Sequence, residues 1–77
     1  PITKPRIWKL LKQTNVYRIL KGARGTVYDA QFLVDTIYNI HLFAISFEQK
    51  ITEIDVNPII VQEEGGYVVD MKVYIKQ

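Results

Sequence analysis

The feature that most constrains the fold is a pair of alternating segments near the end of the chain. Residues 53–61 and 67–75 place apolar side chains, many of them β-branched, at every second position, and a glutamine, two glutamates and two glycines separate them. This pattern predicts two strands joined as a β-hairpin. With 77 residues, the chain is expected to form a single small domain over residues 1–77, or part of a larger one.

A symmetric turn over residues 63–66 sets the predicted register, with Gln62 opposite Tyr67. One face of the hairpin is then almost wholly apolar, and we expect it to cover the core. It comprises Ile54, Val56, Pro58, Ile60, Tyr67, Val69, Met71, Val73 and Ile75. The other face includes Asp55, Asn57, Asp70 and Lys72.

The oxygen-bearing side chains of that second face are candidate metal ligands. Asn57 and Asp70 become diagonal neighbours about 7 Å apart at Cβ, and Lys72 lies across from Asn57. Pro58 holds Asn57 in an extended conformation, and Asp55 stands next along the strand. Two such oxygens suit Mg²⁺ or Mn²⁺ when phosphates and water supply the remaining ligands. A half-solvated hairpin with Asp and Asn on its outer face shows the same pattern, and the spacing alone leaves both interpretations open.

The preceding residues predict two helices and one strand. Helices are expected over residues 5–13 and 30–47, the second capped by Asp29, and a strand over residues 16–21. The fold class is therefore α+β, with two helices packed on a small antiparallel sheet in the order α-β-α-β-β. His41, on the apolar second helix, is expected to be a hydrogen-bonded interior residue.

Charge divides the chain in two. Residues 1–28 carry seven basic side chains and no acid, whereas residues 29–77 carry a net charge of −5. This asymmetry suggests an anionic partner for the first third, although a solvated basic face is the commoner explanation of such a charge pattern. The absence of cysteine fits a reducing compartment, and no apolar run is long enough to span a bilayer. We therefore expect a cytoplasmic protein, and the missing initial methionine suggests a trimmed chain.

Several segments together resemble one known family. They are "YRILKGARG", Asp29 opening an apolar helix, "EIDVNPIIV" and "YVVDMKVYI". They are similar to the C-terminal part of the ATP-grasp domain of NDP-forming acyl-CoA synthetases, the acetate–CoA ligase (ADP-forming) group related to the succinyl-CoA synthetase β subunit. The resemblance covers about residues 16–75. It implies a fragment of an ATP-grasp domain, acting with ATP or ADP.

The resemblance also implies roles for individual residues. Asn57 and Asp70 match the magnesium ligands of the family, and Asp55 matches an acidic position beside them. Arg24 matches the arginine of an Arg-Gly turn with a phosphate-side or structural role, and Lys72 keeps the charge of a family arginine. Residues 26–28 depart from the family, which usually has prolines after this turn.

The resemblance further implies partners, because the chain carries only part of the family's machinery. The adenine pocket, the phosphate-covering loop and the phosphohistidine lie elsewhere in the family. The remainder of the ATP-grasp domain and the CoA-binding, phosphohistidine part are therefore the expected partners, and the isolated chain is expected to be inactive. One alternative is a non-catalytic docking module that keeps this fold. Nucleic-acid binding is disfavoured, because no exposed aromatic residues are interleaved with the basic ones.

Overall fold

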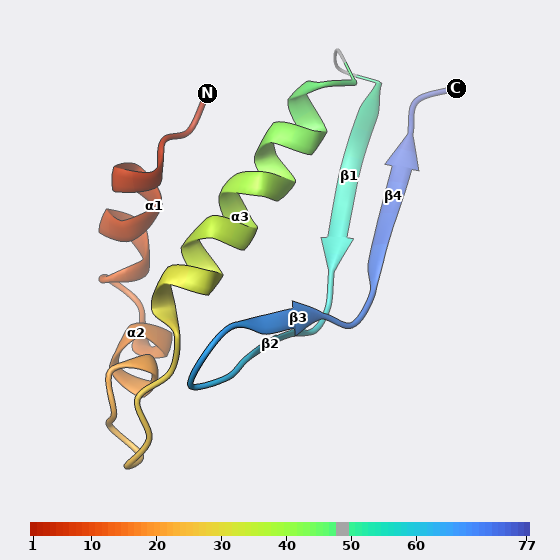
Figure 1. Cartoon of the computed structure of the whole chain (residues 1–77). Coiled ribbons are helices and arrows are strands. Elements are labelled where there is room, and N and C mark those ends of the chain that lie inside the picture. Colours follow the sequence, from red (N-terminus) through yellow and green to blue (C-terminus); the bar gives the residue numbers. More distant parts are fainter. Residues whose placement is uncertain (48–49) are drawn as a thin grey trace.

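The computed structural model describes residues 1–47 and 50–77. It contains three helices, α1 (Lys4–Leu11), α2 (Asn15–Leu20) and α3 (Ala30–Ile45). Four strands follow, β1 (Ile51–Val56), β2 (Ile59–Val61), β3 (Gly66–Val68) and β4 (Met71–Ile75). The strands form two antiparallel pairs, β1 with β4 and β2 with β3. The predicted α+β class is therefore confirmed, and Figure 1 shows α3 lying between α1 and the β1–β4 pair.

Helix α3 begins at the residue that its predicted cap indicates, and α1 begins one residue before its predicted start. Thr3 accepts a hydrogen bond from the backbone N–H of Arg6 at 3.4 Å, and Pro5 lies in the first turn of α1. Asp29 accepts one from the N–H of Phe32 at 2.9 Å and caps α3. His41, on α3, is half-buried and accepts a hydrogen bond from the N–H of Ile2 at 3.1 Å. The expectation of a hydrogen-bonded interior histidine is confirmed.

The strand predicted over residues 16–21 is wrong, because this segment forms α2. Thr14 caps it by accepting a hydrogen bond from the N–H of Tyr17 at 3.3 Å. Leu20 is buried, and Tyr17, one turn earlier, is half-buried against the core. Over six residues an alternating pattern and a single helical stripe look alike, and the threonine cap favours the helix.

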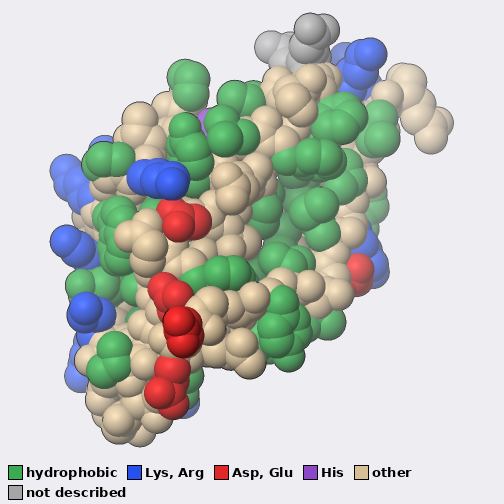
Figure 2. All heavy atoms as spheres, viewed as in Figure 1, with side chains coloured by type: hydrophobic (Ala, Val, Ile, Leu, Met, Phe, Trp, Pro, Cys, Tyr) green, Lys and Arg blue, Asp and Glu red, His purple; other side chains and the backbone are tan. Residues whose placement is uncertain are grey.

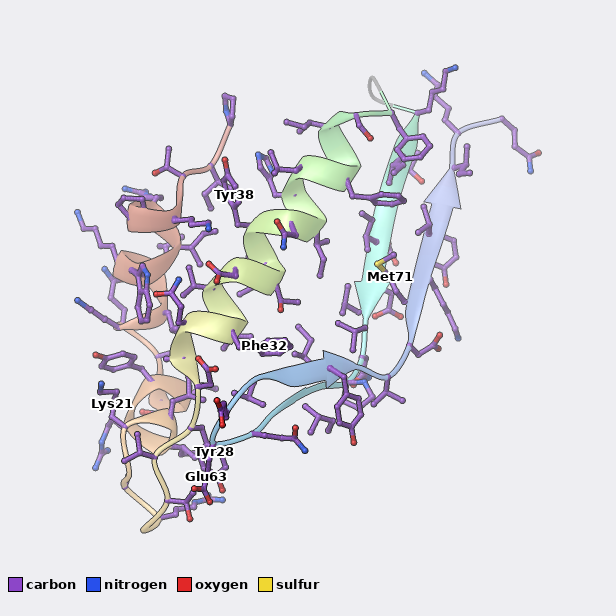
Figure 3. The ribbon with its side chains drawn as sticks, in the orientation of Figure 1. Lys21, Tyr28, Phe32, Tyr38, Glu63 and Met71 are labelled. Carbon is purple, nitrogen blue, oxygen red and sulfur yellow. The ribbon has the colours of Figure 1, made fainter. Side chains whose placement is uncertain are left out.

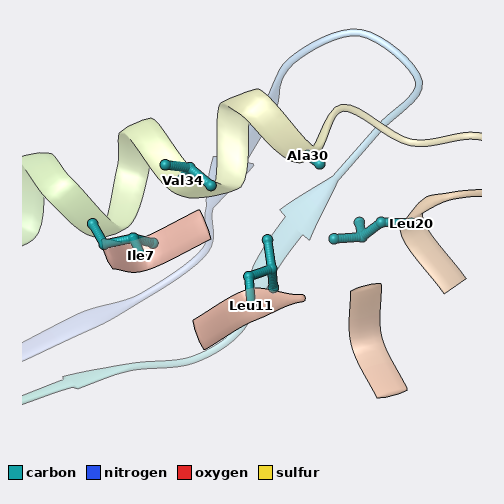
Figure 4. Packing of buried hydrophobic residues seen from close by; sticks show 5 residues of the cluster. All are labelled: Ile7, Leu11, Leu20, Ala30 and Val34. Atoms are coloured by element: carbon teal, nitrogen blue, oxygen red, sulfur yellow. The ribbon is translucent and has the colours of Figure 1, made fainter. Parts of the chain in front are cut away.

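The hydrophobic core lies among the helices. Its five buried residues are Ile7, Leu11, Leu20, Ala30 and Val34, which Figure 4 shows converging from α1, α2 and the start of α3. Val61 of β2 packs against this cluster, and Val34 is completely inaccessible to solvent. No residue of β1 or β4 is buried to the same degree, so the core sits at the helical side of the molecule.

The predicted hairpin register is wrong by two residues. The turn is tighter than expected, since the N–H of Gln62 donates to the carbonyl of Gly65 at 2.9 Å. Ile60 therefore faces Tyr67, and Asp55 faces Lys72. A shift of two residues leaves every side chain on its predicted face, because the side-chain period of a strand is also two.

The hairpin nevertheless changes its buried face along its length. In β1, Ile54 and Val56 are half-buried as predicted, but in β3 the predicted core residue Tyr67 is 53% exposed. The change falls at Pro58, which separates β1 from β2 because it has no N–H for the ladder. Beyond it, Phe32 lies so close to Gly66 that a Cβ there would be 2.7 Å from its ring. Figure 3 shows Phe32 pointing from α3 toward β2 and β3.

Candidate functional site

Asn57 and Asp70 lie directly opposite each other where the β1–β4 ladder ends. The backbone N–H of Asn57 donates to the carbonyl oxygen of Asp70 at 3.1 Å, and both residues are exposed. Residues opposed in this way have Cβ atoms about 4.5–5.5 Å apart on one face, closer than the predicted diagonal spacing. One amide oxygen and one carboxylate oxygen at this spacing can reach a common cation.

Asp55 and Lys72 form the next opposing pair with polar side chains on the same face. The observed register pairs Asp55 with Lys72, so the predicted placement of Lys72 across from Asn57 is wrong. Within the described residues the one ion pair joins Lys4 and Asp35 at 3.0 Å, so neither Asp55 nor Lys72 forms an ion pair there. The two side chains are exposed and can reach a ligand bound beside Asn57 and Asp70, at the end of the β1–β4 ladder. We call this place the junction.

The donor set at the junction fits magnesium. Among residues 1–47 and 50–77, no group of three or more His, Asp and Glu side chains is placed to hold a metal. The pair Asn57 and Asp70 supplies two hard oxygens, and Asp55 a third further along β1. Magnesium commonly takes one or two protein oxygens and fills its octahedron with water and phosphate. The residues present therefore suit a metal that arrives with a nucleotide.

Arg24 lies in an exposed turn between two glycines with positive φ, Gly22 at 106° and Gly25 at 98°. It lines a shallow pocket together with Tyr28 and residues 59–61 of β2. The β2 residues that line this pocket begin at Ile59, two residues after Asn57 in the sequence. The structure thus brings Arg24 toward the strand that follows the Asn-Pro step, while Lys72 lies on the ladder before it.

Asp29 joins the hairpin to α3, a role that sequence reasoning missed. Its second carboxylate oxygen accepts a hydrogen bond from the N–H of Gly65 at 2.7 Å, and its own N–H donates to the carbonyl of Gln62 at 2.8 Å. The bonds from Gly65 and then Phe32 hold the pKa of the Asp29 carboxyl below its usual value, because they stabilise its charged form. The cap was visible in the sequence, but a contact across 36 residues has no local signal.

Comparison with known proteins places the chain in a family. The profile of the ATP-grasp domain family matches residues 1–75, and the chain belongs to this family. It is 34% identical over 76 residues to an ADP-forming acetate–CoA ligase of Methanocaldococcus jannaschii, covering 95% of this chain and 11% of that protein. It is 33% identical over 79 residues to the β subunit of an ADP-forming acetate–CoA ligase II of Pyrococcus furiosus. That match covers 99% of this chain and 34% of the subunit.

A third relative, an ADP-forming acetate–CoA ligase I of Archaeoglobus fulgidus, is 29% identical over 97% of this chain and 11% of its own length. The chain therefore spans only about a tenth to a third of the relatives it matches. The resemblance to ADP-forming acyl-CoA synthetases is confirmed at the level of the family. No solved structure gives a significant match. No helix in the described residues is long and apolar enough to cross a membrane.

Proposed function

We propose that this chain is the metal- and nucleotide-binding C-terminal portion of the ATP-grasp domain of an ADP-forming acyl-CoA synthetase. The reaction interconverts an acid, CoA and ATP with acyl-CoA, ADP and phosphate, and we expect it to take place in the cytoplasm. The observation that carries the proposal is the direct opposition of Asn57 and Asp70. Membership of the ATP-grasp family supports it, as do the names of the relatives.

Each polar residue at the junction has a distinct role in this proposal. Asn57 and Asp70 hold Mg²⁺, or Mn²⁺, while Asp55 adds negative charge beside them. Lys72 and Arg24 approach the phosphates of ATP or ADP from the strand and the glycine turn. A magnesium ion bound there would offset the charge of the phosphates during phosphoryl transfer. The protein side chains position the nucleotide relative to that charge.

The remaining parts of the enzyme are the proposed partners of this chain. They comprise the rest of the ATP-grasp domain and the CoA-binding, phosphohistidine part, on the same or a separate chain. Hydrophobic residues gather where such a partner would pack, on the last turns of α3 and on β4. On β4 they are Met71 and Ile75, which share one face of the strand, and near the end of α3 they are Leu42, Phe43 and Ile45, with Phe47 just beyond it; each is at least 38% exposed. Figure 2 shows hydrophobic side chains lining the hollow between α3 and the strands.

A chimera tests the proposal. This chain would replace the matching third of the Pyrococcus furiosus β subunit, and ADP-forming acetyl-CoA synthesis would be assayed with the rest of that enzyme. Asn57→Ala and Asp70→Ala should each lower the rate at least about a hundredfold, because a metal ligand is lost. Glu63→Ala and Glu64→Ala, acids in the hairpin turn, are matched controls expected to stay within about twofold. Equal activity of all four variants in a folded chimera would refute the proposal.

The second candidate function is a docking module without catalysis. The exposed apolar residues of α3 and β4 favour it, since they fit a protein partner as well as they fit the rest of the domain. The module predicts partner binding or self-association that Asn57→Ala leaves unchanged and Phe43→Asp abolishes. Sedimentation of the two variants beside the unaltered chain distinguishes this function from the proposed one.

A further inference from the structure

A second polar site lies on the opposite side of α3 from the Asn57–Asp70 junction. Pro5, Trp8, Lys9 and Lys12 follow one another at spacings of three, one and three residues, so they form a single stripe along α1. Together with Tyr17 of α2 they line an open pocket of about 610 Å³. None of these residues belongs to the proposed metal site or to the exposed apolar residues of α3 and β4.

The pocket lies in the basic third of the chain. No acidic residue occurs before Asp29, and in the described residues the one ion pair occupies Lys4 rather than Lys9 or Lys12. Figure 2 shows Lys and Arg side chains gathered along the edge where α1 and α2 lie. Two ammonium groups without a neutralising carboxylate, three residues apart on one helix face, suit a ligand with a doubly or triply charged phosphate group.

Two aromatic rings form the other part of the lining. Trp8 and Tyr17 are half-buried and pack against the hydrophobic cluster, so the core holds them in place while part of each ring remains accessible. Contrary to the expectation from the sequence, the accessible part of an aromatic ring does stand among the basic residues here, because Trp8 directly precedes Lys9. An aromatic wall fixed in this way offers a stacking surface for a flat heterocycle, and lysines beside it attract the phosphate attached to such a ring.

We propose that this pocket binds a phosphorylated nucleotide, with its base against Trp8 and Tyr17 and its phosphates at Lys9 and Lys12. The site goes beyond the proposed function, because α3 separates it from Asn57 and Asp70 (Figure 1). Its lining contains no carboxylate to hold a metal, so the lysines would face the phosphates directly. The chain would thus hold a nucleotide at a place separate from its proposed metal–nucleotide site.

The fluorescence of Trp8 provides the test, because it is the only tryptophan in the chain. ADP is titrated in the presence of EDTA, which prevents metal-dependent binding elsewhere, and saturable quenching is expected. Adenosine and pyrophosphate, titrated separately, should each bind at least about tenfold more weakly, because each satisfies only half of the pocket. Lys12→Glu should weaken ADP binding at least about tenfold. Lys21→Glu, which changes the net charge equally outside the pocket, should weaken it less than about threefold.

Three results would overturn the proposal. The first is an absence of saturable quenching by ADP, and the second is an equal loss for Lys12→Glu and Lys21→Glu, which would show attraction by net charge alone. The third is a loss of quenching in Asn57→Ala, which would place the nucleotide at the junction. If circular dichroism shows that Lys12→Glu unfolds the chain, Lys9→Gln is titrated instead, and the same weakening of ADP binding is expected. A failure of the metal site leaves the Trp8 titration unchanged, so the two proposals fail separately.

Discussion

The two sides of the molecule differ in how completely they are packed. The helical half, formed by α1, α2, the start of α3 and β2, contains all five residues that are buried among residues 1–47 and 50–77. The β1–β4 ribbon has none among its described residues, and its strands pair mainly with each other. A two-stranded ribbon is only marginally stable without a further strand or a covering helix. The stability of the chain and its candidate chemistry therefore reside in different regions, and the second region is the one that needs a partner.

The largest expected difference in the free energy of unfolding is between two variants that each introduce one aspartate, the first in the helical half and the second in the β1–β4 ribbon. Val34→Asp should unfold the chain, because a buried carboxyl without a partner costs more than about 4 kcal/mol, comparable to the whole stability of a domain this small. Ile75→Asp, at a side chain of β4 that is 59% exposed, should change the free energy of unfolding by less than about 1 kcal/mol. Urea unfolding followed by circular dichroism measures both. Similar losses would contradict the division into two regions.

A smaller effect is expected from removing apolar contacts at matched leucines. Leu11→Ala should reduce the free energy of unfolding by about 2–4 kcal/mol, since Leu11 is 8% exposed and the cavity cannot close fully. Leu42→Ala, at a residue 42% exposed on α3, should cost less than about 1 kcal/mol. Thermal unfolding of the two variants gives the comparison. A larger loss at Leu42 would show that the C-terminal end of α3 is packed in solution.

The smallest effect concerns Asp29, whose hydrogen bonds with Gly65 and Gln62 connect α3 to the hairpin. Its contribution to stability depends on pH. Because the pKa of Asp29 is lowered in the folded state, its stabilisation is present above the ordinary value of 3.8 and is lost as the pH falls through the folded pKa. Asp29→Ala should lower Tm by roughly 4–8 °C at pH 7, and the difference from the unaltered chain should shrink below about pH 4. Thr14→Ala removes a neutral cap, so its Tm difference should stay constant with pH. A Tm difference for Asp29→Ala that persists at pH 2 would mean that the charge is not responsible.

Local signals predicted much of this fold. The apolar spacing marks α1 and α3, the cap at Asp29 marks the start of α3, and the alternation of residues 53–61 marks the hairpin. The segment at Asn15–Leu20 was misassigned because one and a half helical turns are too short to reveal their period. Local patterns thus identify an element when it is long enough to repeat.

What the sequence could not provide depends on tertiary contacts. The buried face of the hairpin changes at Pro58 because Phe32 packs against Gly66, and neither residue signals the other. The proximity of Asn57 and Asp70 was predictable because a shift of two residues preserves strand faces, although the two residues are directly opposed rather than diagonal. The bond from Gly65 to Asp29 was not predictable, since it depends on where the turn meets the helix.

The most direct test of the central claim is an amide NMR titration of the chain with Mn²⁺, with and without ADP. The account predicts paramagnetic broadening centred on Asn57 and Asp70, sharpened by ADP and lost in Asn57→Ala. Diffuse broadening at exposed acids such as Glu63 and Glu64, unchanged in Asn57→Ala, would contradict it. The junction would then be an ordinary solvated hairpin face.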